Sequence, residues 1–400
     1  MIRALLRNTD LVEITRRMRG GQEENLSDVV ARVAWTVIAE PGDAVAGVLL
    51  QEFGAVDALR YALEGAGGAP SPEVRSAGAV RALAEARRRW KPRADPAAVL
   101  RALIDAERVG AQLLVPGDAF WPDSLADLGA GAPSALWVRG RAELLAAPAR
   151  VSVVGARAAS GYGERVASDL AGDLAAAGIV VVSGGAYGID GVAHRAALGV
   201  GGDTVAFLAG GVDRAYPAGH QELLRRIAVE GAVVSEPPCG AAPTRWRFLA
   251  RNRLIAALGA ATVVVEAGWR SGSLNTAGHA ATLGRPLGAV PGPVTSASSA
   301  GCHRLLREYG AVCVTSVADV KELLGFADAS EHSAAGAGAD GERVLAAMSG
   351  RVSRSPREIA KRAGLPPDRV RSLLGLLALE GWVMQDGPDW RRVRARAHER

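Results

Sequence analysis

Residues 251–277, RNRLIAALGAATVVVEAGWRSGSLNTA, place anion-binding side chains on both sides of a predicted strand. Two arginines flank an asparagine at the beginning of the stretch. The strand ATVVVEA follows, and the chain then passes into SGS, which is typical of a helix start. Guanidinium groups and helix N-termini both attract anions, so the stretch predicts a phosphate site. The candidates are Arg251, Asn252, Arg253, Ser271, Gly272 and Ser273.

The ends of the other predicted strands repeat this chemistry. Glycine, serine and arginine recur in GARAASGYG, SGGAYGID, AGGVDRAYP, SEPP and PGPVT. Glycines let backbone N–H groups approach an anion, and each following helix adds about half a positive charge at its N-terminus. One glycine-rich turn would be ordinary in an α/β fold, but so many favour a phosphate-lined groove. The candidates are Arg157, Ser160, Gly161, Ser183, Gly184, Gly185 and Gly188.

A third signal is WRFLARNRLIA, in which basic residues alternate with aromatic ones. Arg245 and Phe248 join the arginines named above. Such a pattern suits single-stranded nucleic acid, since the charges follow the phosphates while the rings stack on bases. The alternative is that Trp246 and Phe248 belong to a core and the arginines face solvent. Asn252 between two arginines is a poor choice for a plain helix start, which favours the binding interpretation.

The motifs of several enzyme classes do not occur in the chain. GARAASGYG is not the G-x-G-x-x-G dinucleotide fingerprint, and no G-x-x-x-x-G-K-[ST] loop of an ATPase is present. Neither the G-x-S-x-G of serine hydrolases nor the H-E-x-x-H of zinc proteases occurs. The sequence therefore predicts a binding protein with no cofactor and no metal, and not an enzyme.

Two acidic positions could still do proton chemistry. Asp190 and His194 lie four residues apart on one predicted helix, which would place them on one face. Glu266 ends a buried strand and could act as a general base. The structural alternative is favoured for both: a satisfied histidine, and a carboxylate that accepts hydrogen bonds from nearby backbone amides.

Strands and helices alternate in the middle of the chain and would position these residues. The apolar strands are VSVVG, IVVVSGG, TVAFLAGG, AVVSE, TVVVEAG and PLGAVPG. The helices between and after them are expected at 162–177, 188–199, 217–230, 251–258, 273–283 and 303–309. Such apolar strands predict a parallel sheet covered on both faces, which is a doubly wound α/β domain.

The flanking regions differ from this core, which is expected at 111–324. Residues 1–27 carry no convincing pattern and are expected to be disordered or to precede the true start. Residues 28–110 predict a helical domain. The Ala/Gly/Ser-rich residues 325–340 predict a flexible linker. Residues 341–400 predict three helices and a hairpin, which is the winged-helix order.

Charge and composition limit the class of partner. The net charge is +5, and the final domain is the most basic part of the chain, which suits nucleic acid. The odd number of cysteines, 3, and the lack of a C-x-x-C favour a reduced, cytoplasmic protein. No apolar run approaches the roughly 20 residues of a membrane span.

The assembled motifs resemble those of the DprA/Smf family of DNA-processing proteins. They are SVVGARAASGYG, SGGAYGIDGVAH, GGVDRAYPAGH, SEPPCGAAPTRWRFLARNRLIAALG, VVVEAGWRSGSLNTAGHAATLGRP and AVPGPVTSASSAGCHRLL. The resemblance implies an extended Rossmann-like core, with a helical region like a sterile alpha motif or a helix-hairpin-helix before it and a winged helix after it. It also implies a homodimer that binds single-stranded DNA, protects incoming DNA and loads the RecA recombinase.

The same resemblance implies which residues meet the DNA. It assigns contacts to Arg157, Ser183, Gly184, Gly185, Gly188, Arg251, Asn252, Arg253, Ser271, Gly272 and Ser273. Two positions depart from the pattern. Many relatives have arginine where this chain has Tyr187, which could stack on a base but cannot pair with phosphate. Many have proline where this chain has Leu249, so the backbone there is less constrained.

Two alternatives belong to other classes. The fold also resembles nucleoside-monophosphate phosphoribohydrolases, whose P-G-G-x-G-T-x-x-E carries a catalytic glutamate. This chain has Asn275 and Thr276 near that place, which argues for binding without cleavage. A transcriptional regulator could instead act through the final domain, using Arg369, Arg371 and the arginines of the hairpin. The helix that carries Arg369 and Arg371 is otherwise apolar, with few side chains able to contact base edges.

Overall fold

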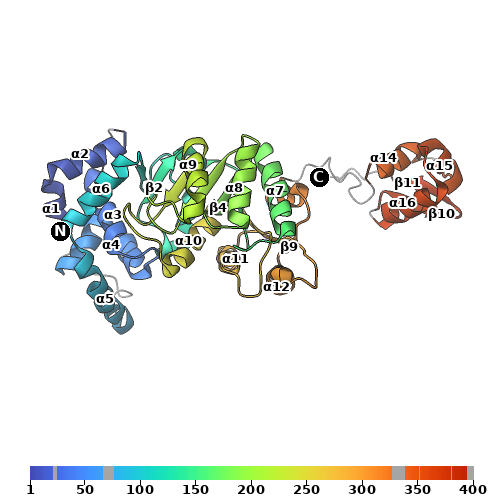
Figure 1. Ribbon diagram of the computed structural model, residues 1–400. Coiled ribbons are helices and arrows are strands. Elements are labelled where there is room, and N and C mark those ends of the chain that lie inside the picture. Colours follow the sequence, from blue (N-terminus) through green and yellow to red (C-terminus); the bar gives the residue numbers. More distant parts are fainter. Residues whose placement is uncertain (21–24, 66–75, 327–337, 351, 380, 394–400) are drawn as a thin grey trace. The chain divides into compact units, whose positions relative to one another are not determined.

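The computed structural model describes residues 1–20, 25–65, 76–326, 338–350, 352–379 and 381–393. The chain forms two compact units, Met1–Phe326 and Ala327–Arg400 (Figure 1). Most of the predicted linker, 325–340, lies outside the described residues.

A nine-stranded sheet organises the described part of the first unit. Its order is β1-β2-β6-β5-β4-β3-β7-β8-β9. The pairs β1–β2 and β2–β6 are antiparallel and all other neighbours are parallel. The predicted doubly wound α/β fold is thus confirmed, with an antiparallel edge. The strands are β1 (Gln112–Leu114), β2 (Leu136–Gly140), β3 (Arg150–Val154), β4 (Val180–Gly184), β5 (Thr204–Leu208), β6 (Ala232–Ser235), β7 (Ala261–Val264), β8 (Leu287–Ala289) and β9 (Val312–Cys313).

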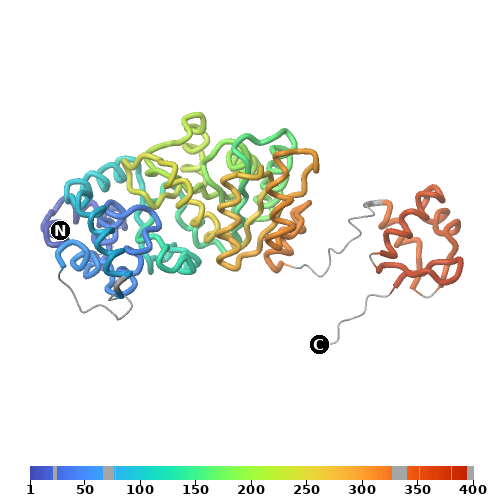
Figure 2. The backbone as a smooth tube through the Cα atoms, turned by 90° about the horizontal axis from the view of Figure 1, so that it is seen from below, coloured from blue at the N-terminus to red at the C-terminus, as the bar shows by residue number. Residues whose placement is uncertain are grey.

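Helices cover both faces of this sheet, because both faces of each central strand are apolar. In β5, Val205 and Phe207 pack on the side of α10, whereas Ala206 and Leu208 pack on the side of α9. Figure 2 views the unit from below, on the α10–α12 side. One layer contains α7 (Gly161–Ala176), α8 (Ile189–Gly199), α9 (Gln221–Glu230) and α13 (Val317–Leu323); the other contains α10 (Arg245–Leu258), α11 (Ser273–Thr282) and α12 (Ala300–Glu308). The 3₁₀ turns of this region are η2 (Asp123–Gly131), η3 (Ala142–Ala146), η4 (Ala218–His220) and η5 (Ala297–Ser299).

The helix expected at 251–258 begins earlier than predicted, at Arg245. Thr244 precedes it in an extended conformation, and its hydroxyl accepts a hydrogen bond from the Arg247 amide at 3.3 Å. This side-chain cap satisfies one of the free amides of the first turn. Asn252 consequently lies inside the helix and is not its start.

Helices also form at the N-terminus, where the sequence predicted none. Disorder was the wrong expectation for residues 2–18. In the second helix Leu11, Ile14 and Met18 are buried, and their spacing of three and four residues gives the helix one apolar face. The helices are α1 (Ile2–Arg7), α2 (Thr9–Met18), α3 (Leu26–Ile38), α4 (Ala44–Glu64), α5 (Ala77–Trp90) and α6 (Pro96–Arg108), with the 3₁₀ turn η1 (Lys91–Arg93).

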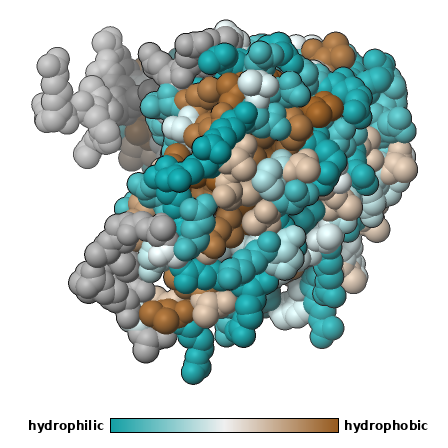
Figure 3. Space-filling view, turned by 90° about the vertical axis from the view of Figure 1, so that its left-hand side faces the viewer, coloured by the Kyte–Doolittle hydropathy of each residue, from teal (hydrophilic) through white to brown (hydrophobic). Residues whose placement is uncertain are grey.

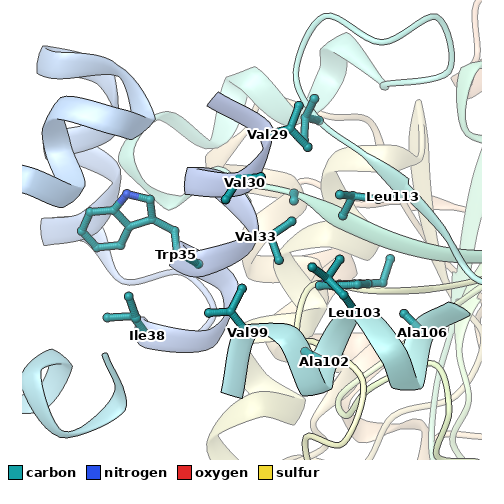
Figure 4. Packing of buried hydrophobic residues seen from close by; sticks show 14 of the residues in the cluster. Val29, Val30, Val33, Trp35, Ile38, Val99, Ala102, Leu103, Ala106 and Leu113 are labelled. Atoms are coloured by element: carbon teal, nitrogen blue, oxygen red, sulfur yellow. The ribbon is translucent and has the colours of Figure 1, made fainter. Parts of the chain in front are cut away.

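The N-terminal helices share a hydrophobic core with the edge of the sheet. Val29 and Val33 of α3 lie beside Leu103 of α6 and Leu113 of β1 (Figure 4). The same cluster reaches Leu224 of α9. Fully burying one such side chain contributes about 1.5–3 kcal/mol, so the cluster binds the helical region firmly to the α/β core. A likeness of this region to a sterile alpha motif stays a prediction.

The second unit has the predicted order of three helices and a hairpin. Ser355 caps the second helix by accepting a hydrogen bond from the Glu358 amide at 3.3 Å, and Gly364 ends it with φ of 65°. Leu373 and Leu377 lie in the hydrophobic core of the second unit. Its identity as a winged helix remains a prediction. The elements are α14 (Gly338–Ala347), α15 (Pro356–Ala363), α16 (Pro367–Leu379), β10 (Val383–Asp386) and β11 (Asp389–Arg392).

The face of the first unit seen in Figure 3 is largely hydrophilic, with hydrophobic residues gathered in places. Exposed apolar side chains of the N-terminal helices include Leu6, Val48 and Val80. Among the described residues, no helix is both long enough and apolar enough to span a membrane.

Candidate nucleic-acid interface

The order of the sheet reverses between β3 and β7. From β3 the chain moves through β4 and β5 to β6, and it returns to the other side of β3 with β7. The loops that leave β3 and β7 diverge, and ligands of open α/β sheets bind in such a crevice. A groove of about 880 Å³ lies there. Its lining includes Gly155, Ala156, Arg157, Asp190, Tyr216, Thr244, Arg245, Phe248, Leu249, Arg251, Asn252, Arg270, Ser271, Gly272, Ser273, Thr276 and Ser298.

Helix α10 supplies the basic and aromatic wall of this groove. Arg245, Phe248 and Asn252 recur every three or four residues, so they share one face of the helix. That face lines the groove, together with Arg251. The basic and aromatic residues of this stretch thus line one groove, and their contact with nucleic acid stays a prediction.

Arg251 is buried but still reaches the groove. Its exposed fraction is 6%, and one Nη donates a hydrogen bond to the Phe207 carbonyl at 2.8 Å. A Cβ on Gly184 would lie 1.8 Å from that nitrogen, so only glycine leaves room for the guanidinium. Burial lowers the pKa of Arg251, and the Asp190 carboxylate opposes this effect. An arginine keeps its charge even so, and the site retains a fixed cation.

Two guanidinium groups lie over the Phe248 ring. The Cζ of Arg157 is 4.8 Å from the ring centroid, and the Cζ of Arg251 is 6.0 Å from it. Tyr216 packs against the same ring, with 5.6 Å between centroids. Arg157 is exposed and forms no ion pair with any residue that the structure describes. Its charge is therefore available to a ligand.

Asp190 is the buried acid of the groove. Burial raises the pKa of this carboxyl group, while the Arg251 charge and the Ala186 amide lower it. The nearby arginines outnumber it, so the groove favours anions. A phosphate is the ligand that this charge and the backbone amides of the loops suit best.

The loop after β7 forms the opposite wall. The hydroxyls of Ser271 and Ser273 lie 2.7 Å apart, and the Ser273 amide donates to the Ser271 hydroxyl at 3.4 Å. Asn252 donates to the Gly272 carbonyl at 3.4 Å and to the Asn275 side chain at 3.2 Å. These bonds fasten α10 to the start of α11, so the two walls of the groove are held together.

Ser160 has partners that keep it from a ligand. Its hydroxyl donates to Glu266 at 2.7 Å and accepts from the Gly163 amide at 3.2 Å, while its amide donates to Glu266 at 2.8 Å. The predicted role of Glu266 as a hydrogen-bond acceptor is confirmed. Neither Ser160 nor Gly161 lines the groove.

Four predicted residues at the end of β4 and in the β4–α8 loop do not line the groove. Ser183 is fully buried and donates its hydroxyl to the Val153 carbonyl at 2.6 Å. Gly188 has φ of 72°, and a Cβ there would lie 2.2 Å from the Ala156 carbonyl oxygen. A Cβ on Gly185 would lie 3.0 Å from the Leu208 side chain, and the Tyr187 hydroxyl accepts a bond from the Gly219 amide at 3.2 Å. All four lie outside the groove lining.

Arg253 lies away from the groove, although the sequence predicted a phosphate contact. Its guanidinium forms a buried ion pair with Glu236 at 2.8 Å and donates to the Gly131 carbonyl at 2.8 Å. Arg247 similarly holds Glu40 of the N-terminal region at 2.9 Å and 3.1 Å. Both arginines thus form ion pairs that hold α10 against neighbouring parts of the first unit.

A model of one protein family matches the core that contains this groove. The model describes the DNA recombination-mediator protein A, and it matches residues 112–325. The chain belongs to this family. The resemblance inferred from the sequence motifs is therefore confirmed.

Individual members of the DNA recombination-mediator protein A family agree with this assignment. A putative DNA processing protein DprA of Mycobacterium tuberculosis is 49% identical, over 74% of this chain and 82% of its own. Protein Smf of Escherichia coli is 37% identical, over 72% and 79%. The X-ray structure of DNA processing protein A from Streptococcus pneumoniae has a TM-score of 0.51 and 36% identity, covering 60% of this chain and 84% of that one.

Several groove residues of this family member were not predicted from its sequence. They are Tyr216, Thr244, Arg270, Thr276 and Ser298. Arg270 could have been found, because it directly precedes the Ser-Gly-Ser loop. Tyr216 lies in AGGVDRAYP, one of the segments expected at the groove, but nothing in that segment distinguishes it from its neighbours. Ser298 carries no local signal.

Asp190 and His194 do not form an acid–base pair. The Nε2 of His194 lies 2.9 Å from the Gly184 carbonyl, and its Nδ1 lies 2.7 Å from the Thr204 hydroxyl. The structural interpretation of this histidine is supported, because both ring nitrogens have partners. Burial lowers the pKa of His194 from 6.5 to about 4.

This lowered pKa predicts acid sensitivity. Between pH 6.5 and about 4 the unfolded chain binds a proton on His194 that the folded chain does not, so stability falls as the pH drops. We expect His194 to account for about 3 kcal/mol of the free energy of unfolding lost across this interval. Urea denaturation of wild type and His194→Gln at both ends of the interval measures it. Equal losses in the two proteins would contradict the prediction.

Proposed function

We propose that this chain is a single-stranded DNA-binding protein that acts in DNA processing. The observation that carries the proposal is the groove between β3 and β7, where Arg157 and Arg251 lie over the Phe248 ring and Arg245 lines the same groove. Cations along a groove neutralise successive phosphates, and an aromatic ring among them can stack on a base. A base is free to stack in this way only when its strand is unpaired.

Binding without cleavage is part of the proposal. Glu266, the acid nearest the β7 end, has its carboxylate occupied by the Ser160 amide and hydroxyl. Asn275 stands near the place where phosphoribohydrolases have a catalytic glutamate, and it accepts a hydrogen bond from Asn252. We expect no release of phosphate from ATP and no release of base from nucleoside monophosphates.

The wider role follows from the family resemblance. We propose that a cytoplasmic homodimer protects single-stranded DNA and loads RecA onto it. Two linked grooves would hold one strand more firmly than a single groove, since the second contact is made at a high local concentration.

A titration with single-stranded and double-stranded DNA over a salt series tests the proposed function. Each phosphate neutralised on a single strand contributes about −0.7 to the slope of log affinity against log salt. The four arginines that line the groove predict a slope of roughly −3 for each groove. Tighter binding of double-stranded than of single-stranded DNA would contradict the proposal.

A chain that ends at Phe326 is the control for the basic second unit. Removal of that unit should leave most of the affinity for single-stranded DNA. In that unit Arg369 and Arg371 already form ion pairs with Asp340 and Asp368. Complete loss of binding on truncation would place the DNA site in the second unit.

A further inference from the structure

An aromatic and basic patch lies beyond the groove, where the loop after β7 meets α12. The Trp269 patch consists of Trp269, Arg270, Arg304, Arg307 and Tyr309. Trp269 is 58% exposed and Tyr309 is 45% exposed, although large aromatic side chains are usually mostly buried. Of the five residues, Arg270 alone also lines the groove.

A close backbone approach brings the two halves of this patch together. The Gly301 amide, at the start of α12, donates to the Ala267 carbonyl at 2.7 Å. A Cβ on Gly301 would lie 2.7 Å from the carbonyl oxygens of both Ala267 and Gly268, so only glycine permits this contact. Arg304 follows about one turn later, and its Cζ lies 5.2 Å from the centroid of the Trp269 ring.

The patch carries excess positive charge. Arg304 pairs with Glu308 at 2.8 Å and lies 5.6 Å from the Tyr309 ring centroid. Arg270 and Arg307 are exposed and form no ion pair within the described residues. The patch thus contains three arginines, of which Arg304 pairs with Glu308 and lies over the Trp269 ring.

We propose that the Trp269 patch is a second contact site for single-stranded DNA, at which a base stacks on Trp269. This inference rests on the proposed function. Arg270 lines the groove and adjoins Trp269 in the chain, so a strand that leaves the groove past Ser271 meets the indole next. Arg270 and Arg307 neutralise the phosphates on either side of the stacked base. An aromatic ring beside unpaired cations is the arrangement that single-strand binding favours.

The first test compares oligonucleotides of increasing length, with Trp269→Ala in the full chain. Removal of one stacking ring weakens binding of long oligonucleotides by about 5-fold to 100-fold. The shortest oligonucleotides, which the groove alone holds, bind wild type and variant equally. Trp269→Phe keeps most of the affinity, because a smaller ring still stacks. Phe120→Ala removes another exposed aromatic ring outside the groove and serves as the matched control.

A second test separates stacking from phosphate contacts. A single abasic nucleotide is moved along a long oligonucleotide. In wild type, one position beyond those held by the groove loses affinity when its base is missing. In Trp269→Ala an abasic nucleotide at that position causes no further loss of affinity, whereas abasic nucleotides within the groove still lower it.

Three outcomes overturn the inference. Equal affinity of wild type and Trp269→Ala at every length shows that no base stacks there. A change of oligomeric state in Trp269→Ala, with single-strand affinity unchanged, makes the patch a contact between two copies. If wild type binds no single-stranded DNA at any length, the proposed function and this inference both fail.

Discussion

Arg251→Ala is expected to weaken single-stranded DNA binding by roughly 10-fold to 100-fold, the usual range for losing a hydrogen bond to a charged group. It should also make the salt slope shallower by about 0.7, because one phosphate is no longer neutralised. Arg251 combines a buried guanidinium, a hydrogen bond to the Phe207 carbonyl and a place in the groove lining. Its position is fixed before DNA arrives, so little side-chain entropy is lost on binding.

Two companion variants sharpen this experiment. Gly184→Ala keeps Arg251 in the sequence but adds a Cβ that would lie 1.8 Å from its Nη. The guanidinium must therefore shift, and the affinity for single-stranded DNA should fall as well. Arg225→Ala removes an exposed arginine of α9 that pairs with Glu222 outside the groove, and it should bind DNA like wild type. If Arg251→Ala and Arg157→Ala both keep the wild-type slope, the DNA site lies elsewhere.

The strands and their order along the chain could be predicted from the sequence, because buried parallel strands are apolar on both faces. VSVVG, TVAFLAGG and TVVVEAG became β3, β5 and β7 nearly as expected. Sheet order could not be derived in this way, since it depends on which strands meet in space. The groove at the β3–β7 reversal follows from that order.

The loops after β3 and β7 supply groove residues, but the glycines and serines at the ends of β3, β4 and β7 play different parts. Gly272 and Ser273 line the groove, whereas Gly188 makes room for the Ala156 carbonyl. Ser160 and Ser183 have short local motifs that suit a phosphate, yet each donates its hydroxyl to a protein oxygen. A sequence motif shows that a serine is near a strand end. The partner of its hydroxyl comes from another strand.

Arginines of α10 illustrate the same limit. Helical periodicity distributes Arg245, Arg247, Arg251 and Arg253 around the helix once its start is known. The start at Arg245 depends on the Thr244 cap, and no cap was predicted at that residue. The carboxylates that bind Arg247 and Arg253 are Glu40 and Glu236, from the N-terminal region and the end of β6. No pattern within WRFLARNRLIA distinguishes an arginine that has such a partner from one that does not.

Arg253→Ala should therefore behave in the opposite way to Arg251→Ala. We expect it to lower the free energy of unfolding by about 3–5 kcal/mol, because it leaves the Glu236 carboxylate buried and unpaired. The pair is 7% and 9% exposed, and the Gly42 amide also donates to Glu236 at 3.3 Å. At a temperature where the variant is folded, its salt slope for single-stranded DNA should equal that of wild type. Urea denaturation and the salt-series titration measure the two effects separately.

The double variant Arg253→Met/Glu236→Gln tests whether the ion pair is the cause. Removing both charges leaves no uncompensated ion, so this protein should be considerably more stable than Arg253→Ala. A methionine also fills part of the volume that the arginine side chain occupied. If Arg253→Ala instead kept the wild-type stability and made the salt slope shallower by about 0.7, Arg253 would contact a phosphate after all. The arginine would then have to leave Glu236 when DNA binds, and α10 would be a moving part of the interface.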